Sequence, residues 1–198
     1  MSIMADTYRL TDLPQFGGHL SLDFANTLVG IEDTKPHDAL ASVDDFLVFA
    51  SRNGLDVKAH PGSDEPALVR ARRMRGSLIA ILRSVAMRQP LPPQAVRDLG
   101  RAAQKSMIDR ELVAAPGRVE WRRMPLGLES ATNLIALKAV RLLEGHEAAR
   151  IRQCTGEHCG WFFLDTSRNG KRRWCSMRYC GNRAKVRRHR REHSLPVS

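Results

Sequence analysis

The sequence has no cysteine before residue 154, no run of about 18 consecutive apolar residues and no internal repeat. The first thirty residues lack an apolar core flanked by positive charge, so we expect no secretory signal there. Without a long apolar run, we expect no membrane-spanning helix. A glycine-rich phosphate-binding loop is also missing, and His19 and Asp23 have no identifiable catalytic partners. These absences argue against a membrane protein and against an enzyme, and we expect a cytoplasmic protein.

Positive charge is distributed unevenly along the chain, whose formal net charge is +11. Residues 150–198 carry thirteen Lys or Arg and three Asp or Glu, whereas residues 1–149 carry nineteen and eighteen. An asymmetry of this kind indicates a polyanionic partner for the C-terminal segment alone. The alternative interpretation is a solvated cationic tail that only aids solubility.

The cysteines form two C-x4-C pairs, Cys154 with Cys159 and Cys175 with Cys180. Each pair places two thiolates on one side of a metal, and the short insert between the pairs brings them together. Sulfur fills all four ligand positions, so we expect one structural zinc ion per chain, with two local disulfides or an iron–sulfur site as alternatives. His158 adjoins Cys159 and could replace a thiolate. A metal is also what a segment of about 45 residues needs to fold, since its own apolar core is too small.

The first 148 residues have the pattern of a mostly helical domain. The stretch from Gly17 to Val29 fits either a strand or a helix, and we favour a helix. Ser42 and Asp45 resemble a capping box at the start of a helix that Gly54 would end. A longer helix opens near Ser63, with an apolar stripe listed here: Ala71, Met74, Leu78, Ile81, Leu82 and Val85.

Three further elements complete this domain, and the first is a helix that follows the break at Pro90, Pro92 and Pro93. Pro116-Gly117 lies between short β-tolerant runs at 112–115 and 118–122, which predicts a β-hairpin. A second long helix is expected over residues 126–143. Four arginines, at positions 70, 72, 73 and 75, form a short basic cluster that we interpret as a solvated helix face.

The cysteine segment, residues 149–198, has the pattern of a separate zinc finger. A short strand at 150–153 leads into the first cysteine pair. Strands at 161–164 and 172–175 would form a hairpin around Asn169-Gly170, and a basic helix would follow Cys180. The predicted fold class is therefore α+β: residues 1–148 form the helical domain, and residues 149–198 form a treble-clef-like or ribbon-like finger that docks against it.

Residues 150–192 closely resemble the CGNR-type zinc finger, which is named for the four residues present here as Cys180-Gly181-Asn182-Arg183. The segment GGHLSLDFANTL resembles the opening of the ABATE domain, which commonly precedes that finger. The resemblance implies a bacterial, stress-induced transcription regulator whose finger binds DNA, and RNA binding has been suggested as well. DNA is therefore the favoured partner over RNA.

The nucleic-acid-binding residues that we predict are Lys171, Arg172, Arg173, Asn182, Arg183, Lys185, Arg187, Arg188 and Arg191. Asn182 could instead brace the metal loop, and Arg183 could pack on Trp174 or bind a carbonyl. We expect Trp161, Trp174 and Tyr179 to belong to the core of the finger rather than to a stacking platform. A third class of function is a metal-stabilised protein-interaction module.

A small-molecule effector is a further partner to consider, and a homodimer is another. His19, Asp23, Asn26 and Thr27 could line a ligand pocket in the helical domain. The alternative, which we favour, is that Asp23 and Asn26 form hydrogen bonds with backbone groups inside the core.

Overall fold

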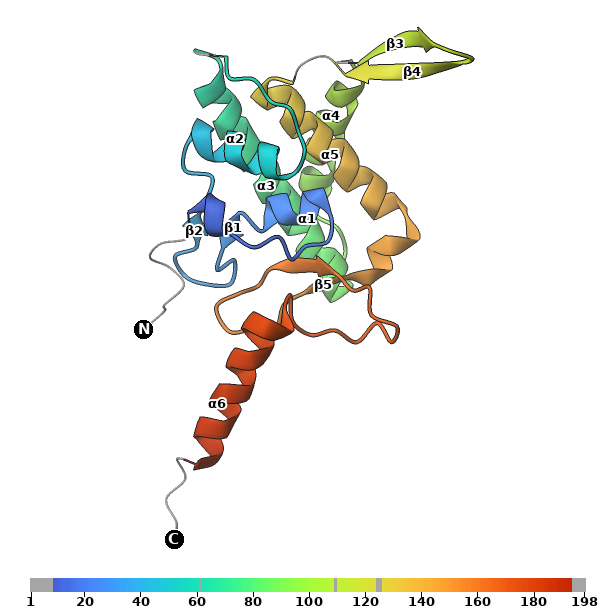
Figure 1. Ribbon diagram of the computed structural model, residues 1–198. Coiled ribbons are helices and arrows are strands. Elements are labelled where there is room, and N and C mark those ends of the chain that lie inside the picture. Colours follow the sequence, from blue (N-terminus) through green and yellow to red (C-terminus); the bar gives the residue numbers. More distant parts are fainter. Residues whose placement is uncertain (1–8, 61, 109, 124–125, 194–198) are drawn as a thin grey trace.

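A computed structural model of the chain describes residues 9–60, 62–108, 110–123 and 126–193 (Figure 1). The α-helices are α1 (Leu20–Ala25), α2 (Val43–Arg52), α3 (Asp64–Met87), α4 (Pro93–Ile108), α5 (Leu128–Glu144) and α6 (Asn182–His193). The strands are β1 (Leu28–Val29), β2 (His37–Asp38), β3 (Arg110–Ala115), β4 (Arg118–Arg123), β5 (Ile151–Gln153) and β6 (Phe162–Leu164). Short 3-10 turns occur at η1 (Leu10–Asp12) and η2 (His146–Arg150), and a π-turn, η3 (Met177–Gly181), precedes α6. The predicted α+β fold is confirmed.

Three helices, α3, α4 and α5, pack together to form the centre of the molecule, and α1 lies against α3 and α5 (Figure 1). The stripe predicted for α3 faces inward, because Ala71, Leu78 and Leu82 are fully buried. The segment for which we favoured a helix forms α1, and Phe24 on α1 packs against Phe46 and Phe49 of α2. None of the described helices is long and apolar enough to cross a membrane.

Helix α2 begins where its sequence predicts. The backbone N–H of Asp45 donates to Ser42 Oγ at 3.2 Å, and the backbone N–H of Ser42 donates to Asp45 Oδ2 at 2.8 Å. This reciprocal pair satisfies two amide groups that the first turn of a helix leaves without partners. The capping box is therefore confirmed.

The hairpin predicted around Pro116-Gly117 is also confirmed. Strands β3 and β4 pair antiparallel, with Ala115 opposite Arg118 at the turn, and Gly117 has the positive φ of 69° that such a turn favours. The hairpin projects from one end of the molecule, and α6 projects from the opposite end (Figure 1).

One predicted strand of the finger is wrong. Strand β6 pairs with β5, through Ile151 opposite Leu164, and residues 172–175 form no strand. The backbone of this returning segment finds other partners. Asp165 Oδ2 accepts the backbone N–H of Arg172 at 2.9 Å, and the Arg172 guanidinium donates to the carbonyls of Trp174 and Cys175. Side chains thus satisfy the groups that a β-ladder would have used.

The basic cluster on α3 is not entirely a solvated face. Arg75 is buried, and its guanidinium donates to Asp38 Oδ1 at 2.8 Å and to Thr27 Oγ1 at 2.8 Å. Arg72 donates to the carbonyl of Leu40 at 2.8 Å. Both arginines fix the loop around β2 to α3. The prediction is therefore wrong for these two residues, because they lie on the side of α3 that the loop covers.

Candidate metal centre and nucleic-acid interface

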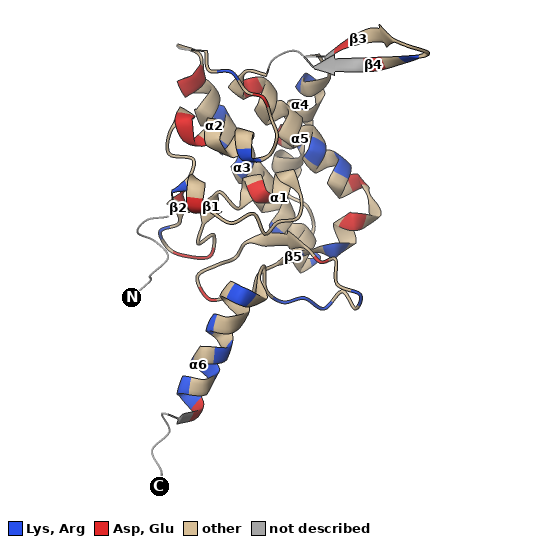
Figure 2. Cartoon of the chain, in the orientation of Figure 1, with Lys and Arg blue, Asp and Glu red and all other residues tan. Residues whose placement is uncertain are grey.

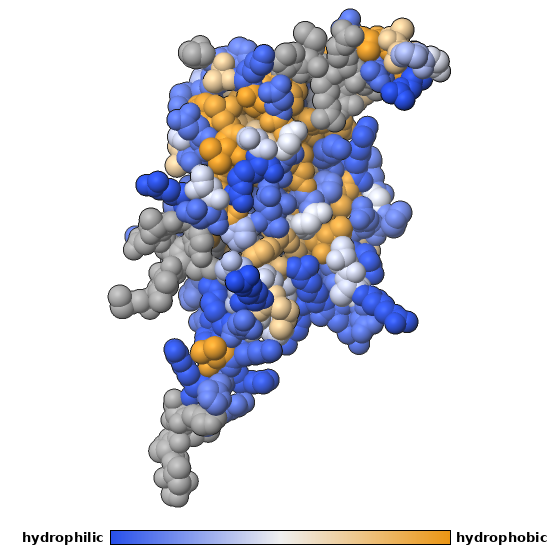
Figure 3. Space-filling model, in the orientation of Figure 1, coloured by the Kyte–Doolittle hydropathy of each residue, from blue (hydrophilic) through white to orange (hydrophobic). Residues whose placement is uncertain are grey.

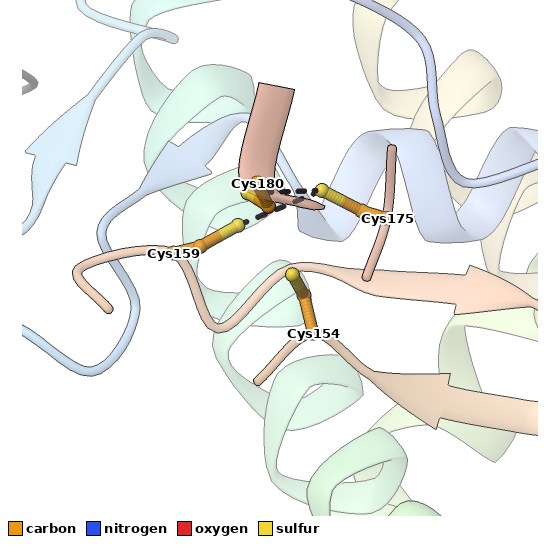
Figure 4. Close-up of side chains that lie close together, drawn as sticks. All are labelled: Cys154, Cys159, Cys175 and Cys180. Atoms are coloured by element: carbon orange, nitrogen blue, oxygen red, sulfur yellow. Dashed lines mark hydrogen bonds between the residues drawn. The ribbon is translucent and has the colours of Figure 1, made fainter. Parts of the chain in front are cut away.

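All four cysteines meet at one point of the finger (Figure 4). Cys154 follows β5, Cys159 precedes β6, Cys175 ends the loop that follows β6, and Cys180 lies in the turn before α6. All four side chains are buried. Residues 154–161 form the tip of the β5–β6 hairpin, so the first cysteine pair is positioned by strand pairing, and the second pair is positioned by the start of a helix.

The distances between the sulfur atoms fit a zinc ion. The Sγ atoms lie within 4.8 Å of one another, and the Cys159–Cys175 and Cys175–Cys180 pairs are each separated by 3.7 Å. Four sulfurs in a tetrahedron with Zn–S bonds of about 2.3 Å are separated by about 3.8 Å. Because sulfur occupies every ligand position, no place is left for water, and the site holds one structural zinc ion, as predicted.

Thiols this close compete for protons. Hydrogen bonds with Cys159 and Cys175 lower the pKa of Cys154 to about 7, and hydrogen bonds with the other three thiols hold the pKa of Cys180 well below its usual value. The same interactions raise the pKa of Cys159 and of Cys175. A divalent cation bound to all four sulfurs releases the remaining protons, so zinc binding is linked to proton release.

Groups around the cluster complement its negative charge. Four thiolates around a divalent ion leave two negative charges. The Arg183 guanidinium donates to Cys180 Sγ at 3.2 Å, and the backbone N–H of Gly156 approaches Cys154 Sγ at 3.4 Å. Gly156 is needed for space, since a Cβ there would meet Cys180 Sγ at 3.0 Å. For Arg183 we considered packing on Trp174 or binding to a carbonyl. In the structure its guanidinium instead binds the sulfur of a metal ligand.

His158 is not a fifth candidate ligand. Its Nδ1 atom lies 2.6 Å from Asp33 Oδ1, and Nε2 lies 3.6 Å from a carboxylate oxygen of Glu157. The residue has a positive φ of 60°, an uncommon conformation for a side chain that is not glycine. His158 therefore joins the cysteine loop to the loop that follows β1.

Buried polar contacts dock the finger onto the helical part. The side-chain amide of Asn26 donates from Nδ2 to the carbonyl of Phe162 and accepts the backbone N–H of Phe162 at Oδ1, both at 2.8 Å. The backbone N–H of Leu164 donates to the carbonyl of Gly17 at 2.8 Å. Asn26 and Phe162 are both buried, so these bonds are shielded from water.

The other residues of the predicted ligand pocket also bind within the chain. Asp23 Oδ1 accepts the backbone N–H of Gly17 at 2.8 Å, and His19 Nδ1 accepts the backbone N–H of Ser21 at 3.3 Å. Thr27 donates to the carbonyl of Phe24 at 2.7 Å. These contacts agree with the favoured interpretation, hydrogen bonding to the backbone. Asp23 and Thr27 line a cavity of about 10 Å³, which is no larger than one water molecule requires.

Burial affects the titration of two of these groups. Desolvation lowers the pKa of His19, and desolvation raises the pKa of Asp23 to about 6, although the hydrogen bond from Gly17 opposes that shift. Both shifts disfavour the charged form of the side chain.

Three of the predicted nucleic-acid-binding residues combine a partner in the finger with partial burial. The Arg172 guanidinium lies 4.4 Å from the ring centroid of Phe163, in addition to its two carbonyl contacts. Arg187 Nε lies 2.9 Å from Glu157 Oε2, and Arg183 binds Cys180. Each of these side chains is only partly exposed.

The remaining predicted residues are exposed. Lys171 and Arg173 line an open hollow of about 370 Å³ beside the loop after β6. On α6 the exposed residues among those predicted are Asn182, Lys185, Arg188 and Arg191, and Arg188 Nε lies 3.6 Å from Glu192 Oε1. Figure 2 shows Lys and Arg along the whole of α6, and Figure 3 shows that the surface of this projecting helix is mainly hydrophilic, whereas apolar patches lie over the helical part. Asn182 forms no side-chain hydrogen bond with the described residues, so the structure shows no brace to the metal loop.

The aromatic residues of the finger differ in burial, and each has a contact within the chain. Trp161 is 6% exposed, and Tyr179 packs against Phe16 with ring centroids 5.3 Å apart. Trp174 is partly buried, with the Arg173 guanidinium 5.3 Å from its ring centroid. The placement of Trp161 and Trp174 agrees with the expectation that they belong to the core of the finger, whereas the expectation is wrong for Tyr179, which is 45% exposed.

Sequence reasoning missed Asp165, which organises the loop that carries the basic residues. Its carboxylate is buried, and it accepts hydrogen bonds from Ser167 Oγ at 2.6 Å, from the backbone N–H of Ser167 and from that of Arg172. The signal was present in the order Asp-x-Ser, a pattern in which an aspartate binds the backbone two residues later.

Comparison with known families supports both resemblances. The family model "ABATE: Putative stress-induced transcription regulator" matches residues 18–146, and the model "CGNR zinc finger" matches residues 150–193. A search among curated proteins found no match. The two matched segments follow each other in the order that the sequence predicted.

Proposed function

Because the chain belongs to the ABATE family, which is described as a family of stress-induced transcription regulators, we propose that its zinc finger binds duplex DNA. The observation that carries the proposal is the shape and charge of α6. The helix projects from the body of the molecule, begins two residues after a metal ligand and carries six Lys or Arg (Figures 1 and 2). A fixed, projecting basic helix has the dimensions that the major groove of DNA admits.

Exposure divides the basic residues of the finger into two groups. Arg172, Arg183 and Arg187 are partly buried beside their partners in the finger, and we assign them to its structure. Arg173 and Arg188 contact Trp174 and Glu192 but remain exposed. Helical spacing of three residues places Asn182, Lys185 and Arg188 along another side of α6. We propose that this side faces DNA, with Lys185 and Arg188 on phosphates and Asn182 in reach of a base edge. Lys171, Arg173 and Arg191 add phosphate contacts.

The salt dependence of binding tests this proposal. If about five cations contact phosphates, the logarithm of the affinity for duplex DNA falls with the logarithm of salt concentration with a slope of about −4 to −5. Replacing both Lys185 and Arg188 with Gln reduces the slope by about 2, because each lost phosphate contact contributes about 0.9. The matched control replaces Arg97 and Arg141, two exposed arginines of the helical part, with Gln and leaves the slope unchanged.

RNA is the second candidate partner, and competition between duplex DNA and RNA at matched salt distinguishes the two. The burial of Trp161 and the partial burial of Trp174 favour DNA, since recognition of single-stranded RNA relies on aromatic rings free to stack with bases. A zinc-loaded chain with no affinity for either polymer at low salt would refute nucleic-acid binding altogether.

We also propose that the chain divides near residue 149 and that the helical part, residues 1–148, responds to a small-molecule effector. His19, Asp23, Asn26 and Thr27 are occupied by contacts within the chain, which supports a structural role for them. Other surfaces of the helical part are therefore better candidates for the effector site.

A further inference from the structure

A surface cavity of about 240 Å³ lies where α3, α4 and α5 meet. Each helix contributes residues from one face, at the three- or four-residue spacing that a shared face requires: Ala67, Arg70, Met74 and Ser77 from α3; Asp98, Arg101, Ala102 and Lys105 from α4; Glu129, Thr132 and Asn133 from α5. Arg73 also borders it. The volume is somewhat below the 300–1,000 Å³ or so that is typical of drug-sized ligands, so the cavity suits a smaller metabolite.

Positive charge exceeds negative charge around the cavity. Four of its residues are cationic, namely Arg70, Arg73, Arg101 and Lys105, and two are anionic, namely Asp98 and Glu129. Glu129 pairs with two of these cations, because one of its carboxylate oxygens lies 2.7 Å from Arg70 Nη2 and the other lies 3.7 Å from Lys105 Nζ. Arg101 is paired with Asp98. Arg73 has no hydrogen bond or ion pair with any residue that the structure describes. Arg73 is thus available to bind an anion at the border of the cavity.

An amide that is almost buried borders the cavity and gives it a polar group for a ligand to bind. Asn133 is only 7% exposed and lines the cavity, yet its side chain forms no hydrogen bond with the described residues. Its neighbour Thr132, also buried, donates to the carbonyl of Leu128 at 2.9 Å. The polar atoms of the Asn133 amide are not fully enclosed, so water in the cavity can reach them. A ligand in the cavity would replace that water as the hydrogen-bonding partner of Asn133.

The remaining lining defines the ligand further. Ala67, Met74 and Ala102 contribute apolar surface, of which Ala67 and Met74 are buried. We propose that this cavity binds a small organic anion, with a carboxylate or phosphate group on Arg73 and its cationic neighbours, an apolar body on Met74 and a polar atom on Asn133. The proposal gives a place and a chemical class to the effector suggested above and rests on it for its regulatory meaning, whereas the binding itself rests on the geometry of the cavity.

The proposal is tested by titrating the full-length, zinc-loaded chain with phenyl phosphate and with benzoate. Binding is monitored through the NMR signals of the asparagine side-chain amides and through thermal unfolding. We expect the Asn133 amide signals to shift and the unfolding temperature to rise. Inorganic phosphate, which lacks the apolar body, and benzyl alcohol, which lacks the charge, should each bind at least about tenfold more weakly, as expected when one class of contact is lost.

Two variants and one control locate the site. Arg73→Glu should weaken binding of both anions at least about tenfold, and Asn133→Leu should weaken it while filling the same volume. Arg97→Glu, on an exposed part of α4 outside the cavity, should bind as the original chain does. If neither anion shifts the Asn133 signals, or if Arg97→Glu weakens binding as much as Arg73→Glu, the proposal is overturned. DNA affinity is measured separately, so a chain that binds DNA but neither anion would refute this site alone.

Discussion

The helical part and the finger are stabilised in different ways. The helical part buries a continuous apolar core, in which Phe24, Phe46 and Leu78 are almost fully inaccessible to solvent. The finger has few large buried side chains of its own, chiefly Phe162 and Phe163, together with four cysteines that meet at one point. A segment of this size gains most of its stability from the metal, whereas the helical part depends on the hydrophobic effect.

The comparison also shows that the two parts are not independent. Ile151, Phe162 and Phe163 are fully buried and contribute to the same apolar cluster as α1 and α3. The buried hydrogen bonds between Asn26 and Phe162 also join the two parts. Contacts with the helical part therefore stabilise the finger in addition to the metal. Removing the metal and removing these contacts should have distinguishable effects on the stability of the protein.

Removing the metal should have the largest effect. Zinc bound to four thiolates contributes about 10 kcal/mol or more to folding of such a module, so a chelator or Cys175→Ser should unfold the finger. The helical part should retain its far-ultraviolet circular dichroism, because its core does not include the metal. Near-ultraviolet circular dichroism, to which Trp161 and Trp174 contribute, reports the loss of the finger.

The control for that experiment is Ser176→Ala, which changes the next residue and leaves all four ligands in place. Elemental analysis should find one zinc ion per chain in the control and in the original protein. Protein that contains no zinc and two disulfides by mass would contradict the metal centre. Loss of helical circular dichroism along with the finger would contradict the proposed division near residue 149.

Breaking the polar contact between the two parts should have an intermediate effect. Asn26→Leu removes two hydrogen bonds and leaves the buried N–H and C=O of Phe162 without partners, which should lower the free energy of unfolding by about 2–4 kcal/mol. Asn53→Leu, which removes one partly exposed bond to the carbonyl of Phe49, serves as the control and should cost about 1 kcal/mol or less. Chemical denaturation measures both, and equal losses would show that the Asn26 contact has no special role.

The smallest expected effect concerns pH. Burial raises the pKa of Asp23 to about 6 from a usual value near 3.8, so the folded state retains a proton that the unfolded state has released between these values. The free energy of unfolding should therefore fall as pH rises from about 4 to about 6, and remain lower above that range. Asp23→Asn removes this penalty and, because the side chain is partly exposed, should stabilise the protein at pH 7 by about 1–2 kcal/mol.

Thermal or chemical unfolding across this pH range gives the measurement. Asp44→Asn, at an exposed position near the start of α2, is the control and should leave the slope as it is. If Asp23→Asn preserves the slope, or destabilises the protein at pH 7, then the burial of Asp23 does not determine this dependence.

Local signals in the sequence predicted most of the elements, and contacts between distant residues account for the rest. The capping box at Ser42, the turn at Gly117 and the spacing of the cysteines each depend on residues close together in the chain, and each was found as expected. The wrong strand at 172–175 had a strong local signal in Asn169-Gly170, but Asp165 and Arg172 satisfy the backbone there without a ladder.

Long-range pairs could not be found in the same way. Arg75 and Asp38 form an ion pair across 37 positions, and Asn26 bonds with Phe162 across 136 positions. Nothing in the neighbourhood of these residues distinguishes a buried asparagine or arginine from an exposed one. The cavity between α3, α4 and α5 is a further case, because its lining comes from three helices that meet only in the folded chain.

The side chain of Asn26 has one more consequence, which concerns the edge of the small sheet. A strand at the edge of a sheet exposes N–H and C=O groups with which another chain can pair, and such edges promote aggregation. On β6, the N–H and C=O of Phe162 are bonded to the Asn26 amide, and the N–H of Leu164 is bonded to Gly17. The Asn26 side chain and the backbone of Gly17 thus take the place of a neighbouring strand, and they close the β6 edge against addition of strands from other molecules.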